Sequence, residues 1–227
     1  MGDSYVNLRA ELRARLGNRG TTLPDSRLDG PLRHAIVQLS SPVVHKHQIL
    51  ETRFSLTTAN GQAAGASADE QAGRYTTPIA LWTIYSMRDV TNNRKIWVSG
   101  RGAQDMVTSS PGQPRYYSRW GRQLEFDPRP NGIFTINIHG YAKPTFTFGG
   151  GPPVLLQGSC PLDDEYDEGV LLGAEYRCWF NVLQDPKRGL LVKNQLADWM
   201  ETIVSPDEGD KDDQGDTMIV DMEGYTQ

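Results

Sequence analysis

The chain has 227 residues, 37% of them hydrophobic and 22% charged, and a net charge of −5. This composition fits a soluble globular protein that is large enough to bury a sizeable core. The sequence holds no run of about eighteen apolar residues, so we expect no transmembrane helix. Its start, MGDSYVNLRAELRARL, lacks the apolar stretch of a signal peptide.

The charge is concentrated near the C-terminus. From Val204 onward there are eight acidic residues and one lysine, which gives this segment a charge of −7 and leaves +2 for the rest of the chain. The body is also rich in arginine, which makes forked contacts with carboxylates and phosphates. Two interpretations stay open for these arginines: ionic contacts with a neighbouring protein, or an ordinary solvated surface of mixed charge.

The N-terminal region predicts a helix over Ser4–Leu16. Leu8, Leu12 and Leu16 recur every fourth residue with charged residues between them. Gly17 is expected to end this helix.

A turn-rich link leads to a second predicted helix, whose apolar residues also recur at helical spacing. We place Pro31 in its first turn, where the missing N–H costs nothing, and expect Pro42 to end it. Each helix has one apolar face, so the two must pack on each other or on later helices. The apolar residues of the second helix are Leu28, Leu32, Ile36 and Leu39.

Short strands follow, beginning with the alternating segment Glu51–Thr58. We read Ala59–Ala72, rich in Ala, Gly and Ser, as a flexible exposed loop. Ala80–Met87 and Lys95–Val98 predict further strands, and Ala103–Val107 one helical turn. Regularly spaced short strands are typical of an antiparallel β-sandwich or barrel.

Two further alternating segments, Arg122–Phe126 and Ile133–His139, flank the sequence DPRPNG. Two prolines and an Asn-Gly pair are strong turn signals, so we predict a β-hairpin. A hairpin that runs into a helical pair is a packing unit rather than an enzyme motif, and it favours a structural role.

The closing region predicts a helical hairpin. Its first helix is capped by Asp163 or Asp164, and Gly173 permits close approach of a neighbour. Asp185-Pro186 begins its second helix. The apolar stripe of the first helix is Tyr166, Val170, Ala174, Cys178 and Val182. The second is lined by Leu190, Ala197, Met200 and Val204, with Leu196, Trp199 and Ile203 beside them.

These elements predict an α+β protein. Residues 1–48 form N-terminal helices, 49–160 an antiparallel β domain, 161–204 a helical hairpin that packs with 1–48, and 205–227 an acidic extended arm.

Several residues could in principle bind a metal or take part in catalysis, but each is explained more simply by a structural role. We therefore expect no catalytic residue, cofactor or metal. A metal would use histidine, but neither His45 nor His47 has a carboxylate nearby in sequence, and His34 and His139 are isolated. The triglycine 149–151 precedes prolines, so it is a turn rather than a phosphate cradle. Cys160 and Cys178 fit no zinc or disulfide motif, and we expect buried, unreactive thiols.

Two clusters remain. The acids Asp163, Asp164, Glu165 and Asp167 resemble a Ca²⁺ or catalytic cluster but are better explained as a solvated helix N-terminus. The aromatic residues Tyr116, Tyr117, Trp120 and Phe126 could stack sugars or bases, although such residues more often fill a β-core or a subunit interface.

The order of these segments carries a resemblance. LRAELRARLGN, ETRFSLTTANGQ and GQPRYYSRWGRQLEFDPRPNGIFTINIHGYAKP occur in sequence before the helical pair, and the third holds Gly112, Pro114, Tyr117 and Asp127-Pro128-x-Pro130. From about Asn7 to Ile203 the chain resembles the head-to-tail adaptor (connector) proteins of tailed bacteriophages. It departs from their pattern in the Ala/Gly insertion before Tyr75 and in the acidic tail.

The resemblance implies a structural virion protein without catalysis, assembled in the host cytoplasm and located in the neck of the virion. It implies a homo-oligomeric ring, commonly a dodecamer, that binds the portal protein and tail or nozzle proteins and surrounds passing viral DNA. The alternative from another class is a carbohydrate-binding β-sandwich of a virion or cell surface, which would use the aromatic residues.

The C-terminal segment is too acidic and Gly-rich to fold alone. Yet it contains the run TMIVDM, from Thr217 to Met222, which a purely solvating tail would not need. We predict an acidic tether followed by an arm that orders on the portal or on an adjacent subunit, against the plainer reading of a flexible terminus. The predicted binding residues are Met218, Ile219, Val220, Met222 and Tyr225.

Overall fold

The computed structural model describes residues 2–42, 44, 48–61, 63, 65–99, 110–149 and 154–204. Helix content of 41% and strand content of 27% confirm the α+β class. The helices are α1 (Tyr5–Leu16), α2 (Asp25–Leu39), α3 (Ala68–Gln71), α4 (Asp167–Arg177) and α5 (Pro186–Val204). The strands are β1 (Glu51–Thr57), β2 (Arg74–Thr76), β3 (Leu81–Asp89), β4 (Arg94–Lys95), β5 (Trp97–Val98), β6 (Tyr116–Trp120), β7 (Gln123–Asp127), β8 (Thr135–Ala142), β9 (Thr147–Phe148) and β10 (Leu156–Gln157).

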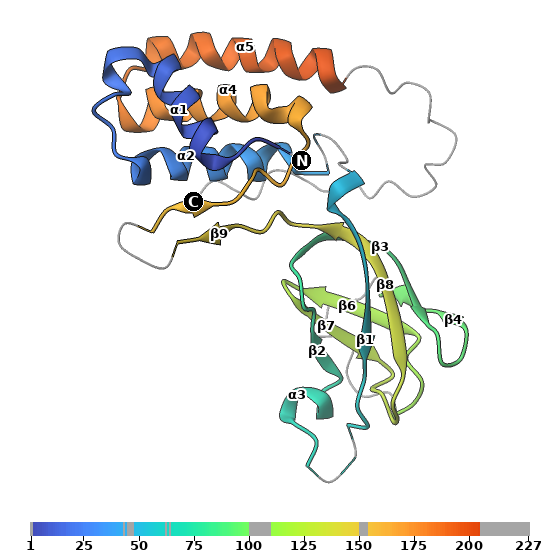
Figure 1. Ribbon diagram of the computed structural model, residues 1–227. Helices are drawn as coiled ribbons and strands as arrows, with labels where there is room; N and C mark the ends of the chain where they lie inside the picture. The colour runs from blue at the N-terminus through green and yellow to red at the C-terminus, as the bar shows by residue number, and fades with distance from the viewer. Residues whose placement is uncertain are drawn as a thin grey trace.

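Helices α1, α2, α4 and α5 form a helical layer at one end of the molecule, and β1 to β8 form a β part at the other (Figure 1). Helix α1 starts as predicted, because the Ser4 hydroxyl accepts a hydrogen bond from the Asn7 N–H (3.2 Å). It ends at Gly17, whose φ of 60° suits glycine. At Gly173 a Cβ would lie 3.0 Å from the Cβ of Ala35, so this glycine lets α4 approach α2, as predicted.

Pro31 is not in the first turn of its helix. Helix α2 begins at Asp25, which places Pro31 in the helix interior. The repeat of leucines begins only at Leu28, but the acidic residue Asp25 is favourable in the first turn of a helix. The helix therefore extends further toward the N-terminus than its apolar stripe. It ends at Leu39, before Pro42, as predicted.

The helical hairpin begins after Asp163 with a 3-10 turn that leads into α4, and α4 continues into a π-helical turn over Cys178–Val182. Asp185 then caps α5, since its Oδ1 accepts from the Arg188 N–H at 3.3 Å. Four residues of the predicted stripe of α4 are buried and the last is half-buried: Tyr166, Val170, Ala174, Cys178 and Val182.

The predicted lining of α5 is partly wrong. Leu190 is 53% exposed and Ala197 is also exposed, and the buried Val192 was not predicted; the predicted Leu196 is buried, and Trp199, Met200 and Ile203 pack against the helical core as expected. The reason is the close approach at Gly189, where a Cβ would lie 3.2 Å from the Phe180 ring. This contact turns the Gly189 side of α5 toward the neighbouring helix, which a count of apolar residues does not reveal.

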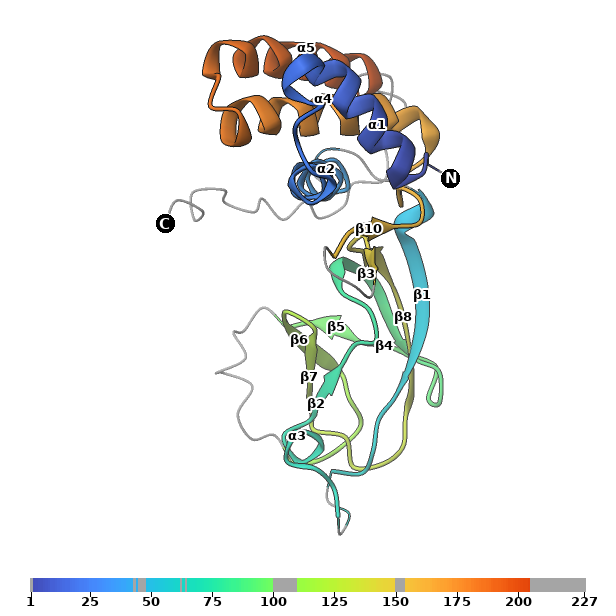
Figure 2. The ribbon, with the colours of Figure 1, turned by 60° about the vertical axis from the view of Figure 1, so that its left-hand side comes forward.

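The β part contains two four-stranded sheets, one in the order β1-β8-β3-β4 and the other in the order β2-β7-β6-β5 (Figure 2). All pairs are antiparallel except β5 with β6. Both sheets contribute to one hydrophobic core, whose buried members are Tyr75, Leu81, Met87, Ile96, Tyr117, Leu124, Phe126, Ile136 and Ile138.

The predicted hairpin between Arg122–Phe126 and Ile133–His139 is wrong. Strand β7 pairs with β6 and β2, whereas β8 pairs with β1 and β3, so DPRPNG crosses from one sheet to the other. Both segments bury their apolar side chains in the same core, as the alternation predicts. Alternation alone cannot distinguish neighbouring strands from strands that face each other across a core. The hairpin that does form joins β6 and β7 through Gly121, whose φ is 58°.

The segment Ala59–Ala72 is not a loop throughout. It contains α3, which begins with a capping box: the Ser67 hydroxyl accepts from the Glu70 N–H (3.2 Å), and the Glu70 carboxylate accepts from the Ser67 N–H (2.8 Å). The predicted turn over Ala103–Val107 lies outside the described residues.

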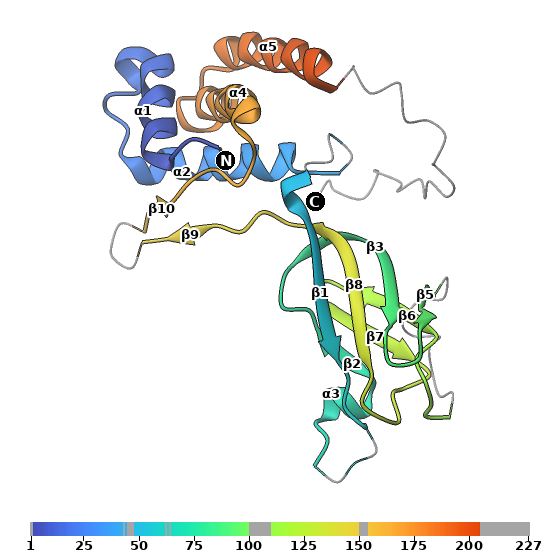
Figure 3. The ribbon, with the colours of Figure 1, turned by 45° about the vertical axis from the view of Figure 1, so that its right-hand side comes forward.

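Strand β8 connects the two ends of the molecule (Figure 3). Its Ile136 and Ile138 belong to the core of the β part, while Tyr141 belongs to the core of the helical layer. The chain then forms the ribbon of β9 and β10 beneath the helices and returns to α4 (Figure 1).

We expect Ile136→Ala to lower the free energy of unfolding by about 2–5 kcal/mol, because this side chain is fully buried. The control is Thr57→Ala on β1, an exposed strand position, which should cost less than about 1 kcal/mol. Chemical denaturation of both variants measures the difference. Equal losses would show that the inward face of β8 is misassigned.

Candidate interaction surfaces

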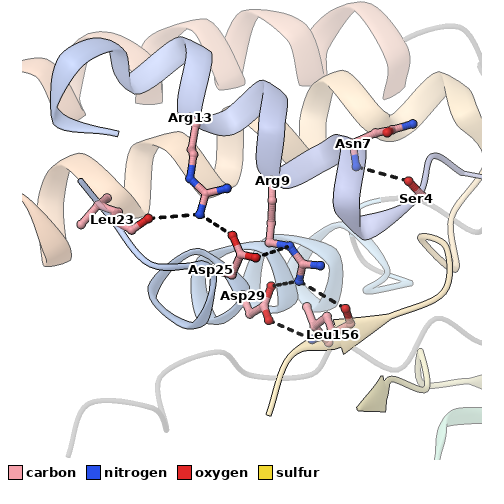
Figure 4. A network of polar contacts seen from close by, with 8 residues as sticks. All are labelled: Ser4, Asn7, Arg9, Arg13, Leu23, Asp25, Asp29 and Leu156. Atoms are coloured by element: carbon pink, nitrogen blue, oxygen red, sulfur yellow. Dashed lines mark hydrogen bonds and ion pairs between the residues drawn. The ribbon is translucent and has the colours of Figure 1, made fainter. Parts of the chain in front are cut away.

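A buried ion pair joins the first two helices to the returning ribbon (Figure 4). Arg9 Nη1 of α1 and Asp29 Oδ1 of α2 are 2.7 Å apart, and the side chains are only 7% and 10% exposed. The same Nη1 donates to the Leu156 carbonyl oxygen (3.2 Å), and Asp29 Oδ2 accepts from the Leu156 N–H (2.8 Å). Both charged groups therefore bind the backbone of β10 as well as each other.

Two further arginines of α1 pair with acids of the same chain. Arg13 pairs with Asp25 and donates to the Leu23 carbonyl oxygen (3.1 Å) (Figure 4). Arg15 bonds Glu168 of α4, and this hydrogen bond is the main reason that the pKa of Arg15 is raised. The same bond lowers the pKa of Glu168. Helix α1 is thus clamped to α2 and to α4.

These pairs show what some of the many arginines of the chain contact. Arg9, Arg13 and Arg15 find their carboxylates within the chain, so they are not available as free cations for a partner. Sequence reasoning missed this pairing, since Arg9 and Asp29 are twenty residues apart and Arg15 and Glu168 are 153 apart.

Exposed aromatic side chains gather on the outer side of the second sheet. Trp97, Tyr116 and Trp120 are 55%, 45% and 60% exposed. The β5–β6 register pairs Trp97 with Tyr116, and strand alternation puts Trp120 on the same side as Tyr116. We call these three residues the aromatic face.

The predicted aromatic group is therefore divided. Tyr117 and Phe126 are buried in the core of the β part, whereas Tyr116 and Trp120 belong to the aromatic face. The core interpretation is confirmed for Tyr117 and Phe126, whereas the exposure of Tyr116 and Trp120 leaves stacking and subunit contact both as predictions.

A second apolar surface lies on the helical layer. Phe180 of the π-helical turn is 43% exposed, and Leu190 and Leu191 of α5 are 53% and 66% exposed. Phe148 of the β9–β10 ribbon is also 44% exposed, but this ribbon lies beneath the helices, away from α5 (Figure 1). Large exposed apolar side chains in groups are typical of protein–protein contact sites.

The residues considered for chemistry are dispersed. His34 is exposed on α2, His139 Nε2 lies 3.8 Å from the Glu51 carboxylate, and His45 and His47 lie outside the described residues. No group of three or more potential metal ligands occurs in the part of the chain that the structure describes. None of the described helices is long and apolar enough to cross a membrane.

The acidic cluster forms the start of the helical hairpin, as its plainer reading predicts. Asp163 precedes the 3-10 turn, and Asp164 and Glu165 lie in it. Asp167 begins α4 and accepts a hydrogen bond from the Asp3 N–H (2.9 Å), which ties the N-terminus to this helix. Burial nevertheless raises the pKa of Asp167.

Both cysteines are buried and free, as predicted. Burial raises the pKa of Cys160 and of Cys178 to about 12. Only the thiolate is a strong nucleophile or metal ligand, so these neutral thiols are unreactive near neutral pH. The predicted binding residues Met218, Ile219, Val220, Met222 and Tyr225 lie outside the described residues.

The family model described as SU10 adaptor protein matches residues 3–213 of the chain. The match spans both the helical layer and the β part. No curated protein matches the chain significantly.

Arg9→Met should lower the free energy of unfolding by about 3–5 kcal/mol, because it leaves the Asp29 carboxylate buried without its counter-charge. The double variant Arg9→Met/Asp29→Leu should recover part of this loss, since no unpaired charge remains, although the Leu156 N–H and carbonyl oxygen lose these partners. Arg15→Met, which breaks a more exposed pair, should cost at most about 1 kcal/mol. Urea denaturation compares the three, and an equal loss for the two single variants would contradict the special role of the buried pair.

Proposed function

The chain belongs to the SU10 adaptor protein family, and we propose that it assembles into a closed ring between the portal and the tail of a bacteriophage virion. The observation that carries this proposal is the match over residues 3–213, which includes every described helix and strand. A phage adaptor is a structural protein of the virion neck. We propose the ring, its contacts with the portal and tail, and its role in the passage of DNA.

The distribution of exposed apolar residues supports a ring. A cyclic assembly needs two different patches on each subunit, which meet head to tail and close by rotation. The aromatic face lies on the β part, and Phe180, Leu190 and Leu191 lie on the helical layer. These are two different apolar surfaces, one on the β part and one on the helical layer, and a head-to-tail contact needs two different patches.

We propose further details on the same basis. The ring is a dodecamer, assembled in the host cytoplasm, that binds the portal on one side and tail or nozzle proteins on the other. The β part is a sandwich within residues 49–160, and residues 161–204 pack with 1–48 as one helical domain. The channel of the portal continues through the ring.

A second function is favoured by one observation. The aromatic face presents three exposed rings on one side of a sheet, and such rings can stack on sugars. A carbohydrate-binding protein of a virion or cell surface would use them in this way. In the proposed ring, the same rings contact a neighbouring subunit.

Electron microscopy of the purified portal–tail complex tests the ring. We expect this protein as a closed ring coaxial with the portal, with Trp97 and Trp120 covered by a neighbour. Single copies or dimers in that complex would contradict the proposal. A glycan screen on the isolated protein, repeated with Trp120→Ser, separates the alternative: binding that is lost in the variant would favour it.

The C-terminal arm makes a second prediction. Truncation after Val204 should leave the melting temperature nearly unchanged, because the core of the body lies before this residue, while docking to the portal is lost. The control keeps every acidic residue and replaces Met218, Ile219 and Val220 with serine in the full chain. If apolar side chains bind the portal, this variant should fail to dock as well. Full affinity of the truncated protein in surface plasmon resonance would disprove the arm.

A further inference from the structure

The outer side of the first sheet differs chemically from the aromatic face. Strand alternation turns Phe54, Met87 and Ile138 toward the core, and their strand neighbours face outward. The outward residues are mostly exposed and polar. The pairing register aligns Arg53, His139 and Ser86 in one row, and Ser55, Asn137, Arg88 and Lys95 in the next.

Three cations on this side have no carboxylate within ion-pairing distance in the part of the chain that the structure describes. Among the described residues, Arg53, Arg88 and Lys95 form no ion pair with a carboxylate. Arg88 donates to the side-chain oxygen of Asn93, and Lys95 Nζ lies 4.0 Å from the centroid of the Trp97 ring. This differs from α1, whose arginines are paired within the chain. We call Arg53, Arg88 and Lys95 the cationic face.

Of the acids of the same sheet, one is buried and one shares this surface. Asp89 of β3 is fully buried on the inward side, and its carboxylate accepts from the amides of Asn92 (2.7 Å) and Gln113 (3.0 Å). Glu51 at the start of β1 is exposed on the same side as Arg53, and its carboxylate lies 3.8 Å from His139 Nε2. The exposed side of the sheet therefore carries three cations, Arg53, Arg88 and Lys95, against the one carboxylate of Glu51, so it is positive although the whole chain carries −5.

We infer that the cationic face is the surface of the subunit that meets duplex DNA in the channel. This inference rests on the proposed ring and names the face that lines it. The occupant follows from charge: a uniform polyanion is complementary to cations and short polar groups on a sheet that presents few acids. The edge strands β1 and β4 are three strand spacings apart, about 14 Å. Arg53 and Lys95 can thus reach phosphates on both sides of a major groove about 12 Å wide.

The small number of cations suits a moving polymer. Each phosphate contact adds binding free energy, so a dense cationic wall would retain the DNA, whereas a few salt-screened contacts for each subunit guide it without holding it. The contacts are directed at the backbone, which makes the expected binding independent of base sequence.

The test measures binding of the full-length chain to a short labelled duplex of random sequence by fluorescence anisotropy over a series of NaCl concentrations. Three phosphate contacts predict a slope of log K against log salt of about −2.7, and each neutralised residue should reduce it by about 0.9. The variant Arg53→Gln/Arg88→Gln/Lys95→Gln should therefore lose nearly all of the salt-dependent binding. The matched control, Arg27→Gln/Arg33→Gln/Lys187→Gln, removes three exposed charges from the helical layer and should keep the slope.

Several outcomes would overturn the inference: no binding by the unmodified chain at the lowest salt, an unchanged slope in the first variant, or an equal loss in the control. Circular dichroism should show the same fold for all three proteins, because every substituted side chain is exposed. Particle mass with the portal is measured in parallel. If the ring forms but the protein does not bind DNA, only this inference is contradicted. If no ring forms, the proposed function is contradicted.

Discussion

The arrangement of the molecule depends on one buried ion pair. Arg9 and Asp29 hold α1 to α2, and both also bind the backbone of Leu156, which is 147 residues away from Arg9 in the sequence. Backbone hydrogen bonds extend this junction, since the Tyr5 N–H donates to the Gly158 carbonyl (3.1 Å) and the Cys160 N–H to the Asp3 carbonyl (2.9 Å). The chain that returns from the β part is thereby fixed along the N-terminal helix.

A buried ion pair is a poor source of net stability, because removing two charges from water costs about as much as their attraction returns. Its value is that each charge accepts few alternative partners. A purely apolar contact between α1, α2 and β10 would tolerate small shifts in register. Here a carboxylate with one oxygen on Arg9 and the other on the Leu156 N–H permits one position of the strand. The helical layer is held in one orientation on the ribbon, as the proposed closed ring would require.

The sequence predicted those features that depend on neighbours along the chain. Helix starts at Ser4 and Asp185, the close approach at Gly173 and the inward faces of β7 and β8 each follow from local spacing. It failed where the answer depends on distant partners. The alternation of β7 and β8 was read correctly, but each strand pairs with a different sheet. The contact of Phe180 with Gly189 rotated α5 away from its predicted lining. Two of the surfaces could not be predicted from the sequence for the same reason. The aromatic face is formed by the β5–β6 pairing, and the cationic face by the register of four strands.

The cationic face and the aromatic face of the β part are connected by three consecutive residues of the chain. Lys95 ends β4 in the first sheet, Ile96 is buried in the core with 2% exposure, and Trp97 begins β5 in the second sheet. Burial of Ile96 turns the residues on both sides of it outward, and it brings the Lys95 ammonium over the Trp97 ring. A subunit that covers Trp97 in a ring would therefore also restrict the position of Lys95. Since a cation–π contact is stronger when water is excluded, assembly would fix this edge of the cationic face while Arg53 and Arg88 stay in water. In the proposed ring, contact between subunits and contact with DNA would then depend on the same three residues, Lys95, Ile96 and Trp97, where the chain passes from one sheet to the other.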